Sequence, residues 1–174
     1  MITDQQGRVI EIVNGVEIEP KQYNNVIAKQ IVDILKERKY LIATSESCTA
    51  GRIVASLTSM SGSSEVVRGG ICAYCDEIKH QLLDVPMEDL KKYTAVSEPV
   101  AIAMARGIKK VMGTNCSISA TGYADGKKVI YVCASLNDKF VCKELNYNSS
   151  RLYNTNDAVK EGLQLMLSLL QEEK

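Results

Sequence analysis

Residues 40–59 read YLIATSESCTAGRIVASLTS, and this stretch decides the fold. Residues 40–44 form a short apolar run that is typical of a strand. Small and polar residues follow in TSESCTAG, residues 44–51, and apolar residues return at helical spacing over about 49–59. A strand, a tight polar turn and a helix in direct succession predict one unit of an α/β fold.

The same kinds of pattern continue along the rest of the chain. Amphipathic helices are predicted over residues 23–39 and 77–83, in a short turn opened by Pro86, from the N-cap Ser97, and from about residue 156. Strands are predicted over residues 66–74, 115–121, 128–135 and 140–147, the last two as an antiparallel hairpin. Helices and strands alternate early and strands cluster late. This order predicts a three-layer α/β/α sandwich with a mixed sheet.

The first residues differ from this pattern. Residues 7–20 alternate apolar and polar side chains around Asn14-Gly15, a strong hairpin signal. We therefore expect an N-terminal β-hairpin extension over residues 1–22 and a single larger domain over residues 23–174.

Composition excludes several classes of protein. The chain has 174 residues, of which 45% are hydrophobic, and its 21 basic and 21 acidic residues give no net charge. The hydrophobic fraction argues against wholesale disorder. The balanced charge argues against a nucleic-acid or anionic-membrane partner. The sequence lacks a bilayer-spanning apolar run and the layout of a signal peptide. We expect a soluble cytoplasmic protein.

Six cysteines could form disulfides by number, but the expected compartment is reducing, so free buried thiols are favoured. Cys72 and Cys75 have CxxC spacing within a stretch that is predicted to be a buried strand. A zinc site would need a second pair or a histidine, and His80 is the only histidine. We interpret this pair as structural.

The candidate chemistry begins at the turn after the first strand of the domain. Ser47 or Cys48 at a strand-to-helix elbow would be exposed at the sheet edge, where unpaired amides at the start of the helix can hold a phosphate or an oxyanion. Serine and threonine are also ordinary helix N-caps, and for this segment alone that simpler interpretation is favoured. A histidine-dependent triad is disfavoured because the chain has only His80.

Tyr74 and Lys79 are a second candidate pair, because both could turn toward the edge that carries Ser47. A lysine can serve as the base for a serine where burial favours its neutral form. The alternative is a solvated lysine on a surface helix. Thr121, at a strand end, and Arg151, ahead of the last helix, are weaker candidates when taken singly.

Together, several ordered blocks resemble the C-terminal domain of the CinA competence/damage-inducible proteins. The blocks are TSESCTAG, GSSEVVRGGICAYCDEIK, LLDVP, TAVSEPVA and SATGYADG, and the resemblance runs from about Asn24 to Leu170. The stand-alone members of this family are nicotinamide-nucleotide amidohydrolases, also called NMN deamidases.

The resemblance implies a hydrolase that converts nicotinamide mononucleotide to nicotinate mononucleotide and ammonia. It implies Ser-Lys catalysis with no metal or organic cofactor, a small-molecule nucleotide as substrate, and a homo-oligomer. Carried over by position, the catalytic residues are Ser47, Lys79 and Tyr74, and the substrate-binding residues are Cys48, Thr49, Thr121 and Arg151.

The chain also departs from the family pattern. The family's GPxGG-type loop is shortened here to Tyr123-Ala124-Asp125-Gly126, and a second arginine expected four residues after Arg151 is Thr155. These changes would reshape the site for ribose and phosphate. Two alternatives therefore stay open: an amidase of the same type acting on a different small amide, and a catalytically silent binding or interaction module.

Overall fold

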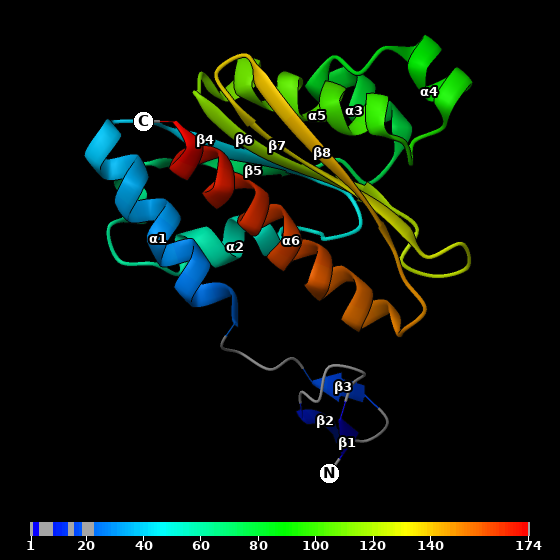
Figure 1. Ribbon diagram of the computed structural model, residues 1–174. Helices are drawn as coiled ribbons and strands as arrows, with labels where there is room; N and C mark the ends of the chain where they lie inside the picture. Colours follow the sequence, from blue (N-terminus) through cyan, green and yellow to red (C-terminus); the bar gives the residue numbers. More distant parts are fainter. Residues whose placement is uncertain (1, 4–8, 14–15, 19–22, 174) are drawn as a thin grey trace.

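The computed structural model describes residues 2–3, 9–13, 16–18 and 23–173 (Figure 1). From residue 23 the order of elements is α1 Tyr23–Arg38, β4 Ile42–Glu46, α2 Arg52–Thr58, a 3-10 turn Ser63–Glu65, β5 Val67–Cys72, α3 Asp76–Leu83, α4 Met87–Tyr93, α5 Glu98–Met112, β6 Cys116–Gly122, β7 Val129–Leu136, β8 Lys139–Asn146 and α6 Arg151–Glu172. Every helix and strand predicted in this part of the chain is present.

Five of the strands form one mixed sheet in the order β5-β4-β6-β7-β8. Strand β4 pairs in parallel with β5 and β6, whereas β6, β7 and β8 pair antiparallel. The predicted mixed sheet and the predicted hairpin of its last two strands are therefore confirmed.

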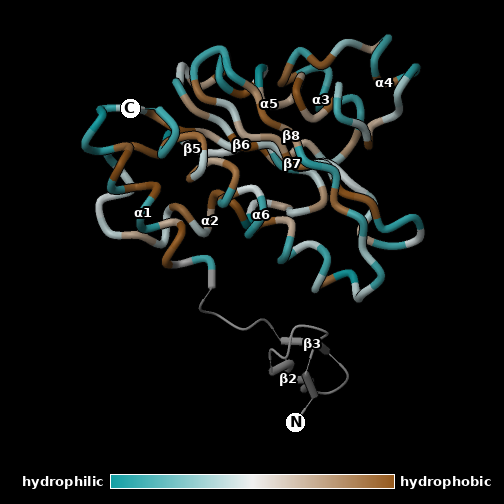
Figure 2. Tube along the Cα trace, in the orientation of Figure 1, coloured by the Kyte–Doolittle hydropathy of each residue, from teal (hydrophilic) through white to brown (hydrophobic). Residues whose placement is uncertain are grey.

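Helices flank this sheet on both faces (Figure 1). Helices α1, α2 and α6 share one hydrophobic core with the sheet, while α5 packs on the opposite face with α3 and α4 against it. Figure 2 shows hydrophobic residues along the central strands and hydrophilic residues over many of the outer turns. Because both faces are covered, all of β4 is buried, and the residue that follows it has a fixed position.

Strand β5 corrects one prediction from the sequence. It is an edge strand whose residues alternate between half-buried and exposed, whereas we expected a buried strand. Cys72 and Cys75 are accordingly exposed. All six cysteines are free, but the expectation of buried thiols holds only for Cys48, Cys116 and Cys133.

Helix α6 corrects a second prediction, because it begins at Arg151 and not near residue 156. Ser150 is its N-cap, and the Ser150 hydroxyl accepts a hydrogen bond from the amide of Tyr153 at 3.1 Å. Such a cap stabilises a helix by about 1 kcal/mol, enough to extend it through a first turn with little apolar periodicity. Arg151 therefore belongs to the helix and does not precede it.

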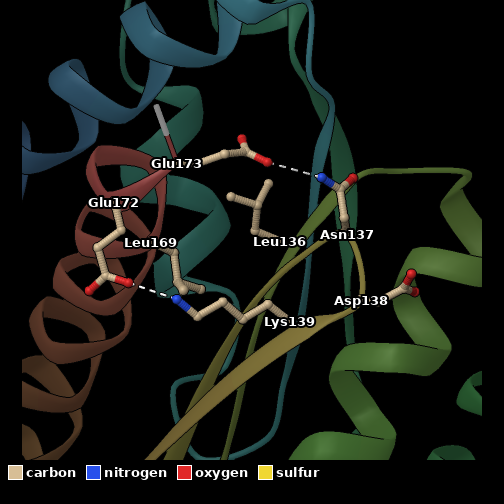
Figure 3. A pocket seen from close by; sticks show the side chains of 7 residues that line it. All are labelled: Leu136, Asn137, Asp138, Lys139, Leu169, Glu172 and Glu173. Atoms are coloured by element: carbon tan, nitrogen blue, oxygen red, sulfur yellow. Dashed lines mark hydrogen bonds and ion pairs between the residues drawn. The ribbon is translucent and has the colours of Figure 1, made fainter.

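The other end of α6 is tied to the turn between β7 and β8 (Figure 3). Lys139 pairs with Glu172 at 2.7 Å, and the Asn137 side chain donates to Glu173 at 3.2 Å. These contacts border a cavity at the end of the sheet opposite Ser47, because Leu136 pairs with Cys116 at the start of β6. They link the C-terminal end of α6, whose first residue is Arg151, to the turn between β7 and β8.

At the N-terminus, β1 Ile2–Thr3, β2 Val9–Val13 and β3 Val16–Ile18 pair antiparallel in a small sheet of their own. The predicted turn Asn14-Gly15 and residues 19–22 lie outside the described residues. No helix in the described part of the chain is long and apolar enough to cross a membrane.

Candidate active site

A cavity of about 350 Å³ lies where β4 and β6 end at the same edge of the sheet. It is lined by Ser47, Cys48, Tyr74, Asp76, Lys79, Ala95, Val96, Thr121, Gly122, Tyr123, Ala124, Asp125 and Arg151. Ligand sites in open α/β sheets commonly lie outside the carboxyl ends of the strands. The structure thus brings together every candidate residue from the sequence except Thr49.

Ser47 directly follows β4 and is held by the sheet. Its amide donates to the carbonyl of Ala120 at 2.9 Å, so the pairing with β6 continues one residue beyond the strand. The chain then turns into α2 through left-handed conformations at Ala50 and Gly51, with φ of 49° and 87°. Ser47 is 8% exposed and lies at the cavity wall.

Glu46 organises this turn and is not among the site residues predicted from the sequence. Its carboxylate is buried and accepts four hydrogen bonds, from the hydroxyls of Thr44 and Thr49 and from the amides of Ile53 and Val54, at 2.7 to 3.1 Å. A carboxylate at a helix N-terminus satisfies amides that would otherwise lack acceptors. An acidic residue just before a predicted helix was the available signal.

Glu46 also accepts hydrogen bonds from amides at the start of α2 that were expected to be free. We expected free amides at the start of α2 to face a ligand, but Ile53 and Val54 donate to Glu46, and Ser47 donates to Ala120. Within the described chain, the amides of Cys48 and Thr49 have no backbone acceptor. Both of these amides interact with the Cys48 sulfur, and the amide of Gly51 also lacks a backbone acceptor among the described residues. These three amides are the candidates for stabilising an oxyanion next to Ser47.

Thr49 does not line the cavity. Its side chain is fully buried, and its hydroxyl donates to Glu46 at 2.7 Å. Its side chain therefore holds the turn in place and is not part of the cavity wall.

Lys79 is the least expected side chain in the cavity wall. It lies on α3 with 2% of its side chain exposed, although the sequence allowed a solvated surface lysine. Its ammonium is 3.7 Å from a carboxylate oxygen of Asp76, which is itself half exposed. Lysine is rarely this deeply buried, so its place in the cavity wall makes Lys79 a candidate functional residue. Ser47 and Lys79 line the same cavity.

Arg151 joins two other parts of the cavity wall. Its Nη2 donates to the hydroxyl oxygen of Tyr74 at 3.0 Å, and its Nη1 donates to a carboxylate oxygen of Asp125 at 2.7 Å. The hydrogen bond to Asp125 is the largest of the interactions that raise the pKa of Arg151. Tyr74, which is largely exposed, is therefore paired with Arg151. Neither this pairing nor the contact with Asp125 was predicted from the sequence.

Thr121 and Cys48 complete the wall near Ser47. The Thr121 hydroxyl donates to the carbonyl of Ala95 at 2.7 Å, which ties β6 to the segment before α5. Burial raises the pKa of the Cys48 thiol to about 12, so it stays protonated near neutral pH. Cys48 is therefore a poor nucleophile beside Ser47. Among the described residues, no cluster of three His, Cys, Asp or Glu side chains could hold a metal ion.

Comparison with known proteins identifies the family of this chain. Residues 24–170 match the model of the CinA C-terminal domain. The chain belongs to that family. A competence-damage inducible protein of Clostridium botulinum (strain Loch Maree / Type A3) is 40% identical over 144 residues, which are 78% of this chain and 35% of that protein. A CinA-like protein of Prochlorococcus marinus (strain MIT 9301) is 46% identical over 101 residues, which are 58% of this chain and 24% of that protein. The chain thus spans about a third of the length of the Clostridium botulinum protein.

Solved structures of CinA proteins have the same fold. A competence damage-inducible protein A of Klebsiella pneumoniae has a TM-score of 0.84 at 22% identity, covering 88% of this chain and 100% of that one. A competence/damage inducible protein of Agrobacterium tumefaciens has a TM-score of 0.81 at 26% identity, covering 84% and 94%.

Proposed function

We propose that this chain hydrolyses the carboxamide of nicotinamide mononucleotide to nicotinate mononucleotide and ammonia. Ser47 is the nucleophile and Lys79 is the base. The observation that carries this proposal is the burial of Lys79 in the wall of the cavity that Ser47 also lines. Membership of the CinA C-terminal domain family and the resemblance to its amidohydrolases support the choice of substrate.

The first half of the proposed reaction forms an acyl-enzyme. Lys79, as the base, takes the hydroxyl proton of Ser47 as the serine oxygen attacks the carboxamide carbon. The amides of Cys48 and Thr49 donate to the oxyanion that develops on the carbonyl oxygen. The bond between carbon and nitrogen then breaks, and the ammonium of Lys79 returns its proton to the leaving nitrogen, which departs as ammonia.

In the second half, water hydrolyses the ester on Ser47. Lys79 takes a proton from the water as it attacks, and the serine oxygen leaves with a proton from Lys79. The product is the free carboxylic acid. Arg151 binds the phosphate of the nucleotide, because a guanidinium can donate two parallel hydrogen bonds to it.

Two lysines allow a matched test of this mechanism. Lys79→Met removes the amine but keeps an unbranched apolar side chain at a buried position. Lys110→Met makes the same change at an exposed lysine of α5 that pairs with Asp84. Ammonia release from nicotinamide mononucleotide should fall at least about 100-fold in Lys79→Met and stay at the wild-type rate in Lys110→Met. An active Lys79→Met with an intact fold by circular dichroism would refute the role of Lys79.

An amidase of the same type with a different small amide as substrate is the second candidate. The contact between Asp125 and Arg151 favours it, because a carboxylate already occupies the group that we assign to phosphate. A panel of pyridine nucleotides and simple amides separates the two candidates. If no amide is hydrolysed, a silent interaction module becomes the better account.

A further inference from the structure

Both terminal nitrogens of the Arg151 guanidinium already have protein acceptors. Nη1 donates to Asp125 and Nη2 donates to Tyr74. A phosphate that approached this guanidinium would meet a neutral hydroxyl on one side and a negative carboxylate on the other. Tyr74 adds no net charge, whereas Asp125 both occupies a donor and repels the incoming anion.

Asp125 is held in this position by the elements around it. It lies in the loop between β6 and β7, where the Tyr123 amide donates to the carbonyl of Val129 at 2.8 Å. The side chain of Asn154, on the first turns of α6, donates to the carbonyl of Ala124 at 3.0 Å. The loop and Arg151 are thus attached to the same helix, which keeps the carboxylate within reach of the guanidinium at a high effective concentration.

The ion pair can nevertheless be displaced. The side chains of Arg151 and Asp125 are 51% and 64% exposed, and exposed ion pairs are screened by water and contribute little. A phosphate carries more charge than a carboxylate and can use two donors of the guanidinium. The expected effect of the competition is therefore a reduction in phosphate affinity of about two- to fivefold.

We propose that Asp125 is a specificity-determining residue that competes with the phosphate group of the substrate for Arg151. This inference rests on the proposed function, in which Arg151 binds that phosphate. Asp125 weakens the binding of phosphorylated substrates and leaves phosphate-free ones unaffected. Asp125 thus reduces the difference in affinity between a nucleotide and the corresponding nucleoside.

The test is calorimetric titration of the full chain with ribose 5-phosphate, and with ribose as the phosphate-free ligand. Asp125→Asn should lower the dissociation constant for ribose 5-phosphate by about two- to fivefold and leave that for ribose unchanged. Asp76→Asn is the matched control, because Asp76 is a half-exposed carboxylate in the same cavity that lies near Lys79. Its effect should be smaller, since it removes the same charge from a carboxylate that pairs with Lys79 and not with Arg151.

Two results would overturn the inference. One is an unchanged or weaker affinity for ribose 5-phosphate in Asp125→Asn, with the fold intact. The other is an equal gain in Asp76→Asn, which would assign the effect to general charge and not to competition. Neither result depends on turnover, so this test and the ammonia assay can fail independently. A chain that releases no ammonia, but binds ribose 5-phosphate more tightly after Asp125→Asn, refutes the reaction and supports the competition.

Discussion

The hydroxyl of Thr49 donates to the carboxylate of Glu46 at 2.7 Å, across the turn that contains Ser47. The same carboxylate accepts the amides of Ile53 and Val54, so one buried side chain holds both the turn and the start of α2. The position of the proposed nucleophile therefore depends on a residue that does not itself line the cavity.

Glu46→Gln tests this dependence. An amide group keeps the size of the side chain, but its NH2 would face buried donors, so the free energy of unfolding should fall by about 1–3 kcal/mol. Activity should fall as well, because the Ser47 turn loses its anchor. Chemical denaturation and ammonia release measure the two effects, with Thr49→Ser as a control that keeps the hydroxyl. Wild-type stability in Glu46→Gln would show that the carboxylate is not needed.

Tyr74→Phe separates two roles for the tyrosine. The hydroxyl oxygen accepts a hydrogen bond from Arg151, so its loss should loosen Arg151 and raise KM for nicotinamide mononucleotide by about two- to fivefold with little change in kcat. If Tyr74 instead has the catalytic role that the family resemblance implies, the substitution should lower kcat. Steady-state kinetics decide between them, and a large loss in kcat at constant KM contradicts a binding role.

Thr121→Val tests the contact between β6 and the segment before α5. The substitution keeps the shape but removes the donor to the Ala95 carbonyl, so unfolding should become easier by about 1 kcal/mol and kcat/KM should fall. Thr121→Ser retains the hydroxyl and should behave like the wild type. Identical thermal unfolding of the valine and serine variants would rule out this contribution.

The cysteines should differ in their reaction with iodoacetamide. Burial raises the pKa of Cys48 and of Cys116 to about 12 from a usual value of 9.0, so both remain thiols as the pH rises from 7 to 9. Because the thiolate is the reactive form, these two should stay unlabelled in the native protein, whereas the exposed Cys75 is labelled. Peptide mass spectrometry after labelling at pH 8 measures how far each cysteine has reacted. Rapid labelling of Cys48 at that pH would disprove its burial.

Local patterns predicted the elements that support the site, but not the contacts between them. The strand, turn and helix around Ser47 follow from spacing alone. The segment DEIKHQLL gives no sign that Lys79 is buried, because that burial comes from the packing of α3 against the rest of the domain. The apolar run before Cys72 resembles a buried strand, yet a strand's place at a sheet edge depends on tertiary pairing.

The contacts of Arg151 were also beyond local patterns. Tyr74, Asp125 and Arg151 come from three distant segments, and only the closure of the fold brings them together. The family resemblance supplied Tyr74 and Arg151 as candidates. It could not supply Asp125, because this chain departs from the family pattern in that loop.

The most direct test of the central claim is ammonia release from nicotinamide mononucleotide by the wild-type protein and by Ser47→Ala. Our account predicts steady release by the wild type and a loss of at least about 100-fold in Ser47→Ala, with unchanged circular dichroism. Equal rates in the two proteins would exclude Ser47 as the nucleophile. No release by the wild type would contradict the proposed substrate.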